Sequence, residues 1–221
     1  MELTVNGAGD ASWIVDLGSA QTVNCVGIAA HNAGTLGATC FVQYSTSGTG
    51  GPWTTIGGIT AASDDQSILW YFEDTSAQYW RVFFDTSGSG DVVCGVISLG
   101  VALTIERRIY QGYRPPLTPT EVALQSNVSE GGHLLGSSVT KKASTASADL
   151  TYLDPATIRG AAWQGFQNHY NNGGGFFWAW RPTKYGDVHY AWRMGGALAP
   201  TNSGPKDYMA AKLEMRLYDE P

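Results

Sequence analysis

Few residues in this sequence are spaced to do chemistry. None of the four histidines lies near enough to another to form an HxH or HExxH metal site, and no GxSxG nucleophile motif is present. The acidic pairs Asp64–Asp65 and Glu73–Asp74 could serve a glycan-degrading enzyme as paired carboxylates, but their polar surroundings would not raise a pKa. We therefore expect no catalytic residues and no enzymatic activity.

A binding site is the more productive hypothesis. Sugar-binding proteins stack aromatic faces on pyranose rings and surround them with short polar side chains. His31 and Asn32 lie in one expected loop and Trp53 follows the turn GTGGP, so these three are candidate glycan contacts. The alternative for Trp53 is an ordinary core or edge-strand position. The loops ASDDQS and DTSGSGD could supply oxygen ligands for a structural calcium ion, and we expect no other cofactor or metal.

Two charged residues stand in otherwise apolar strand sequence. They are Asp16 in WIVDLG and Arg81 in YWRVFF. Because a buried charge usually needs a partner, an ion pair between them is one interpretation and a ligand-binding role is the other.

The composition favours β-structure and argues against two kinds of partner. Charged residues make up 14% of the 221 residues and aromatic residues 12%, with 28 glycines, which indicates short strands joined by tight turns. The net charge is −6 and the basic residues are scattered, so we expect no nucleic-acid partner. No apolar run approaches the roughly 18 residues of a membrane span, and the N-terminal sequence lacks signal-peptide features.

The three cysteines lie in apolar, strand-like sequence without CxxC spacing. They are Cys25, Cys40 and Cys94. An odd count without such spacing argues against a disulfide framework and against zinc, so we expect buried free thiols made in a reducing cytosol.

Turn residues and prolines divide the chain into three parts. Over 1–106, alternating apolar and polar residues between glycine-rich turns predict a β-sandwich or jelly roll. The segment 107–121 contains QGYRPPLTPTE, whose three prolines disfavour both helix and central strand, and reads as a connector. The remainder, 122–221, is a second β-rich domain. The predicted fold class is therefore mainly β with one helix.

The second domain contains the single helix candidate. Residues 133–153 look like two strand-like runs with turn residues between them. The helix is expected over 154–171, with Asp154 as N-cap, Pro155 at the first helical position and NNGGG ending it. The alternation in YMAAKLEMRLYDE predicts a closing strand.

The stretch FFWAWRP begins an expected hairpin with VHYAWRM. Phe176, Trp178 and Trp180 would share one face of the hairpin, opposite Phe177 and Arg181. We interpret one face as core and the other as a packing surface or subunit interface. The candidate assembly residues are Phe177, Arg181, Arg193 and Tyr218.

Residues of about 12–105 resemble discoidin-like (galactose-binding-like) jelly rolls. The matching features are SWIVDLGSAQTVNCVGI, the strand FVQYSTS followed by GPWTTI, and YWRVFF. The resemblance implies the jelly-roll fold. It does not choose a ligand, because family members bind sugars, lipids, proteins or nothing evident.

Residues of about 92–221 resemble tail-tip and baseplate proteins of long-tailed bacteriophages, of the minor tail or distal tail kind. The matching features are GVISLGVALTIERRIYQGYRPP, SEGGHLLGSSV, the helix with GFQNHY, FFWAWRPTKYGDVHYAWRM and KLEMRLYDE. This resemblance implies a virion subunit, made in the host cytoplasm, that joins other tail-tip and tail-tube proteins in a homo-oligomeric ring, a hexamer or a trimer. A complete discoidin-like module departs from the simplest members of that group.

Three functions remain to be distinguished. The first is a structural subunit of the tail tip whose jelly roll contacts a host surface polysaccharide. The second is a lectin-like, carbohydrate-binding adhesin, and the third, which we do not expect, is a glycan-degrading enzyme.

Overall fold

The computed structural model divides the chain into two compact units. It describes residues 2–5, 10–107, 109, 112–118, 121–203 and 205–218. Unit 1 spans residues 1–102 and unit 2 begins at Leu103. Within the expected connector, Ile109 and Tyr113 pack against the hydrophobic core of unit 2. No helix among the described residues has the length and apolar character needed to span a bilayer.

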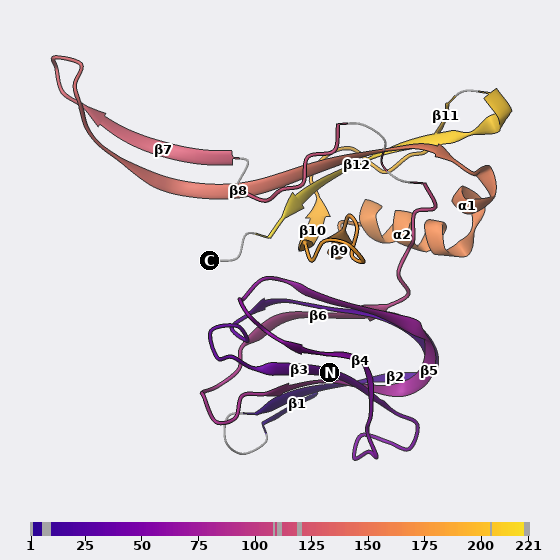
Figure 1. Cartoon of the computed structure of the whole chain (residues 1–221). Helices are drawn as coiled ribbons and strands as arrows, with labels where there is room; N and C mark the ends of the chain where they lie inside the picture. The colour runs from indigo at the N-terminus through magenta and orange to yellow at the C-terminus, as the bar shows by residue number, and fades with distance from the viewer. Residues whose placement is uncertain are drawn as a thin grey trace. The chain divides into compact units, whose positions relative to one another are not determined.

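Unit 1 is a sheet of six strands folded over itself (Figure 1). The pairing order is β1-β2-β5-β3-β4, and β6 pairs with β2. The strands are β1 (Glu2–Val5), β2 (Ala11–His31), β3 (Thr39–Ser45), β4 (Thr54–Ala61), β5 (Ile68–Asp85) and β6 (Cys94–Gly100).

The long strands β2 and β5 close this sandwich by turning a corner together. They pair antiparallel on both sides of register shifts between Asp16 and Gln21 and between Val23 and Cys25. Gly18 lies at the first shift with φ +76°, a conformation that side chains other than glycine's disfavour. The predicted mainly β, jelly-roll-like fold is therefore confirmed for this unit.

The core of unit 1 is built by strand alternation. Trp80, Val82 and Phe84 are 0–2% exposed, while their neighbours Arg81 and Phe83 face outward, as the sequence predicts. The Trp80 indole donates to the carbonyl of Ala77 (3.2 Å), which satisfies its one buried polar atom.

Unit 2 packs two helices against a second antiparallel sheet of order β7-β8-β12-β10-β9, with β11 beside β12. Its elements are β7 (Glu121–Val128), β8 (Leu134–Leu153), α1 (Pro155–Arg159), α2 (Ala161–Asn171), β9 (Phe176–Ala179), β10 (Val188–Arg193), β11 (Thr201–Asn202), the 3-10 turn η1 (Pro205–Asp207) and β12 (Met209–Leu217). The predicted closing strand is β12.

The one predicted helix is two helices. Asp154 caps α1 as expected by accepting from the amide of Ala156 (2.7 Å), but Gly160 is extended at φ −68°, ψ 150° and separates α1 from α2. In a continuous helix Ile158 and Trp163 would point about 140° apart. The break lets both enter the same core, where they are 7% and 1% exposed.

The expected turn within residues 133–153 is absent, because β8 is one strand of 20 residues. Its inner part pairs with β12 as far as Ser144, which lies opposite Leu217. Beyond that point it pairs with β7 alone, and the two strands leave the body of unit 2 as a curved ribbon (Figure 1). We call residues 121–139 the arm.

Candidate functional site

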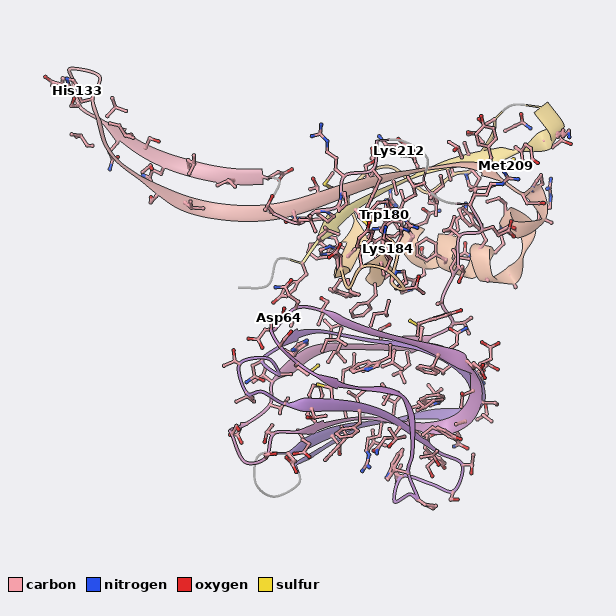
Figure 2. The ribbon with its side chains drawn as sticks, in the orientation of Figure 1. Asp64, His133, Trp180, Lys184, Met209 and Lys212 are labelled. Carbon is pink, nitrogen blue, oxygen red and sulfur yellow. The ribbon has the colours of Figure 1, made fainter. Side chains whose placement is uncertain are left out.

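Three loops of unit 1 meet at one end of its sandwich. The register brings Thr39 opposite both Ala61 and Asp85, and His31 opposite Cys94. The loops that continue from these strand ends are 32–38, 62–67 and 86–93, which together we call the loop end. Asp64 lies on its surface (Figure 2).

His31 ties the first loop to the second. Its Nδ1 accepts from the amide of Ala33 (3.3 Å), so Nε2 carries the hydrogen and donates to the carbonyl of Gln66 (2.9 Å). The residue is 5% exposed, and burial lowers its pKa, although the Gln66 contact and the nearby carboxylates of Asp65 and Asp64 oppose this. The structure thus gives His31 a positioning role beneath the surface.

Asn32 ties the first loop to the third. Its side-chain oxygen accepts from the amide of Val93 (2.8 Å), and its side-chain nitrogen donates to the carbonyl of Asp91 (3.0 Å). Both ends of the amide are therefore engaged, and its backbone amide also donates to the carbonyl of Val93 (3.3 Å).

Asp65 makes a second link between the first two loops. Its carboxylate accepts from the amide (2.9 Å) and the hydroxyl (2.6 Å) of Thr35. The Thr35 hydroxyl contact is the main reason that the pKa of Asp65 is lowered. The loops also touch at Gly34, where an added Cβ would lie 2.0 Å from the carbonyl carbon of Asp64. Only glycine permits so close an approach.

The loop end is acidic and polar. Residues 32–38, 62–67 and 86–93 include three aspartates and no lysine or arginine. The Asp64 and Asp91 side chains are exposed, and Asp64 accepts from the amide of Gln66 (3.1 Å) within its own turn. No cluster of three or more metal-ligating side chains occurs in the described part of the chain. The structural calcium ion stays a prediction.

Trp53 lies at the other end of the β3–β4 hairpin. It precedes Thr54, which is paired with Tyr44, whereas Thr39 and Ala61 mark the loop end. The structure therefore does not bring Trp53 together with His31 and Asn32.

On the outer face of the sheet, the guanidinium of Arg81 packs against the ring of Trp53. The guanidinium carbon lies 4.5 Å from the centre of the indole and 5.3 Å from that of Phe83. Arg81 Nε also donates to the side-chain oxygen of Gln43 (2.8 Å), and its Nη2 contacts the same atom. The guanidinium of Arg81 is thus held between the ring of Trp53 and the side-chain oxygen of Gln43.

The predicted ion pair between Asp16 and Arg81 is not formed, although both residues are described. Asp16 instead accepts from the amide of Gly18 (2.7 Å) and from the side chain of Gln78 (2.9 Å), and these hydrogen bonds, that of Gln78 first, lower its pKa. Arg81 donates instead to the side-chain oxygen of Gln43, because the strand register puts these two residues directly opposite each other.

The second acidic pair and the cysteines of unit 1 lie in structural surroundings. Asp74 accepts from the side chain of Asn24 (2.8 Å), and the main-chain carbonyl of Glu73 accepts from Thr75 (3.0 Å). The cysteines are free thiols, and burial raises the pKa of Cys25 to about 11 and that of Cys40 to about 12. Neither of these two is an activated nucleophile at neutral pH.

The four candidate assembly residues of unit 2 have different surroundings in the structure. The ring of Phe177 lies 5.3 Å from that of Tyr190. The backbone amide of Tyr218 donates to the carbonyl of Tyr190 (2.8 Å). Arg193 is turned inward, where it donates to the carbonyls of Asn171 and Gly195, both at 2.9 Å. Arg181 lies in the turn after β9, with its guanidinium carbon 6.0 Å from the centre of the Trp180 ring.

That turn carries an aromatic cluster, around Trp180 and Lys184 in Figure 2. Trp180 stacks on Tyr185 at 5.7 Å and 16°, and Tyr113 lies 5.0 Å from Trp180. The Trp178 indole donates to the hydroxyl of Tyr113 (2.6 Å). Burial raises the pKa of Tyr113. The cluster fastens Tyr113 to β9 and to the turn that follows it.

Two residues of the loop end, Thr35 and Gly34, have no recognisable signal in the sequence. Thr35 and Gly34 matter only because Asp65 and Asp64, 30 residues later, fold against them. The pair Asp64–Asp65 is visible in the sequence as two adjacent carboxylates, but the contact of Asp65 with Thr35 is set by the tertiary fold.

Comparisons with known proteins find similarity in unit 1. The family described as a NedA-like, galactose-binding domain matches residues 3–82. One similar solved structure is a selenomethionine-labelled point mutant of chitosan-binding module 1, from a chitosanase/glucanase of Paenibacillus sp. IK-5. The two sequences are 31% identical, and the match covers 37% of this chain and 59% of that structure's chain (TM-score 0.31). The unlabelled module is 27% identical over 44% of this chain and 74% of its own (TM-score 0.33). No curated protein matches the chain. The chain therefore carries a galactose-binding-like domain at its N-terminal end.

Proposed function

We propose that the loop end of unit 1 binds a carbohydrate. The observation that carries this proposal is the locking of three loops by the side chains of His31, Asn32 and Asp65. A surface fixed in advance loses little conformational entropy when a ligand binds. The match to the NedA-like, galactose-binding family supports it, since all three residues lie within 3–82.

The exposed groups of the loop end suit a ligand rich in hydroxyl groups. The carboxylates of Asp64 and Asp91 can accept hydrogen bonds from sugar hydroxyls, and charged acceptors make the stronger hydrogen bonds. Because these loops carry no positive side chain, they favour a neutral or amino sugar over a sulfated or uronic-acid glycan.

The predicted contact residues take different roles in this proposal. His31 and Asn32 hold the surface in place, because their ring nitrogens and amide already have partners. Trp53 lies outside the proposed site, with one face of its ring covered by Arg81.

Calorimetric titration of the full chain with galactose, galactosamine, chitosan oligosaccharides and a sulfated galactan tests the proposal. We expect one of the unsulfated sugars to bind and Asp64→Ala to weaken it at least tenfold, with Trp53→Ala as the matched change at the other end of the hairpin. If Trp53→Ala abolishes binding and Asp64→Ala does not, the site lies on the sheet face. If none of the sugars binds, the carbohydrate proposal fails.

A second candidate function, assembly within a phage tail tip, is favoured by one observation in unit 2. The arm leaves the body of its sheet and exposes large apolar side chains, as a subunit that must join others would. Electron microscopy of particles carrying the chain, with an antibody against it, tests this role. Labelled rings at the tail tip are expected, and label away from any particle would count against it.

The enzymatic alternative is tested by turnover of the bound glycan. We expect no released reducing ends from the full chain. Release that disappears in Asp64→Asn, Asp65→Asn or Glu73→Gln would identify a glycan-degrading enzyme instead.

A further inference from the structure

The arm has one apolar face. On β7 the alternate residues Val122, Leu124 and Val128 point to the same side, and the residues paired with the last two, Val139 and Leu134, share it. The side chains of these five residues are 47–66% exposed. The opposite face of β7 bears Glu121, Ala123, Gln125 and Asn127.

This apolar face continues the core face of the sheet of unit 2. Within the body, Ala146, Ala148 and Leu150 of β8 point into the core with Ile158 of α1 and Trp163 of α2. Val122 is paired with position 142, which lies an even number of residues from Ala146 along the same strand. The side that is covered in the body is therefore uncovered in the arm.

Within unit 2, no described residue covers the apolar face of the arm. Of the thirteen exposed large hydrophobic residues in the described chain, five are those of the apolar face, and a sixth, Leu135, lies at a register shift of the arm. A two-stranded ribbon is marginal by itself in water, and monomers rarely expose a continuous apolar patch of more than a few hundred Å². These facts call for an occupant of the apolar face.

The pattern of the three residue pairs beyond Val122 is self-complementary. Along the ribbon, the pair Leu124–Val139 lies on the body side and the pair Val128–Leu134 at the tip, with the small pair Ser126–Ser137 between them. A second arm placed antiparallel, face to face, sets the inner apolar pair of one copy on the tip pair of the other. The serines then meet at the centre, where their small side chains allow close approach. Such self-complementarity is what a two-fold interface requires.

We propose that the arm binds the arm of a second copy of this chain, apolar face to apolar face, about a two-fold axis at Ser126. Two sheets packed in this way lie about 10 Å apart. The contact is smaller than a standard interface of roughly 1,600 Å², so arm-on-arm association alone is expected to be weak, with a dissociation constant on the order of 10 μM. The proposal does not depend on carbohydrate binding.

Sedimentation equilibrium of the full chain, from about 1 to 200 μM, tests the association. We expect monomers at low concentration and dimers at high concentration. Leu124→Glu, which buries a charge in the proposed interface, should weaken the dimer at least tenfold, whereas Gln125→Glu on the opposite face should not. A wild-type chain that stays monomeric throughout, or a Leu124→Glu variant that associates as well as the wild type, overturns the proposal.

Cross-linking then tests the geometry. Ser126→Cys should be joined to its counterpart by a short bismaleimide, and Gln125→Cys should not, with the wild-type chain reporting any background from the native cysteines. Both positions are exposed on β7, so neither substitution should destabilise the fold. Equal cross-linking of the two variants, or cross-linking through position 125 alone, overturns the two-fold arrangement.

Discussion

The long strands of the two units have similar lengths but end differently. β2 and β5 contain 21 and 18 residues, and β8 contains 20. In unit 1 the two strands turn a corner together near Gly18, so that both halves of each strand cover one core. In unit 2 only the inner half of β8 meets β12, and its outer half carries an apolar face away from the core. The corner, more than the length, decides whether a strand closes a domain or extends from it.

The largest expected effect is at the centre of unit 1. Trp80→Ala removes a fully buried ring that packs on Phe72 and Tyr44 at 5.9 Å, and should lower the free energy of unfolding by about 3–5 kcal/mol. Hydrogen exchange should show lost protection in β3 and β5 and unchanged protection in β12. Equal losses in the two units would contradict their separate cores.

Gly34 tests whether the loops of unit 1 are locked against each other. Gly34→Ala would place a methyl group 2.0 Å from the carbonyl carbon of Asp64, and should cost about 1–3 kcal/mol because the backbones must separate. Gly50→Ala is the matched control, since nothing lies within 4 Å of its added Cβ. Thermal unfolding compares them, and equal melting temperatures would mean that the contact is loose.

His31 makes the stability of unit 1 depend on pH. Because burial lowers its pKa in the folded state, the unfolded chain binds the proton more tightly, and stability falls as the pH drops below the unfolded value of about 6.5. In His31→Gln this part of the pH dependence should be missing. Urea unfolding at pH 7.5 and pH 5 measures it, and parallel losses in both proteins would exclude His31 as the cause.

The arm gives the smallest expected effect on the stability of the monomer. Leu124→Ser changes a side chain that is 62% exposed, so at about 1 μM the free energy of unfolding should change by less than about 0.5 kcal/mol. Urea unfolding at this concentration is the measurement. A loss comparable to that of Trp80→Ala would show that the arm packs on its own chain and would remove the contrast between the two units.

Local patterns predicted what depends on local structure. Alternation identified the inward positions of Trp80, Val82 and Phe84, and a capping residue followed by proline marked the start of α1 at Asp154. Alternation also put Phe176 and Phe177 on opposite faces, and the structure buries Phe176 in the core of unit 2. These features follow from residues within a few positions of one another.

What the sequence could not predict depends on distant partners. The break at Gly160 exists because two large side chains must enter one core, and β8 runs through its expected turn because β7 and β12 pair with its two halves. At the loop end, the burial of His31 depends on Gln66, and the fixed position of Asn32 on Val93. No periodicity within either segment carries that information.

The tip of the arm offers a place to attach a label. Its turn is held locally, with the amide of Ser129 donating to the carbonyl of His133 and the amide of Gly132 to that of Ser129, both at 2.9 Å. His133 marks this tip in Figure 2. Exposed turns of this kind tolerate insertions because no core side chain moves to admit them. A short affinity tag or fluorophore-binding peptide placed between Gly131 and Gly132 would therefore report on the chain without entering either hydrophobic core.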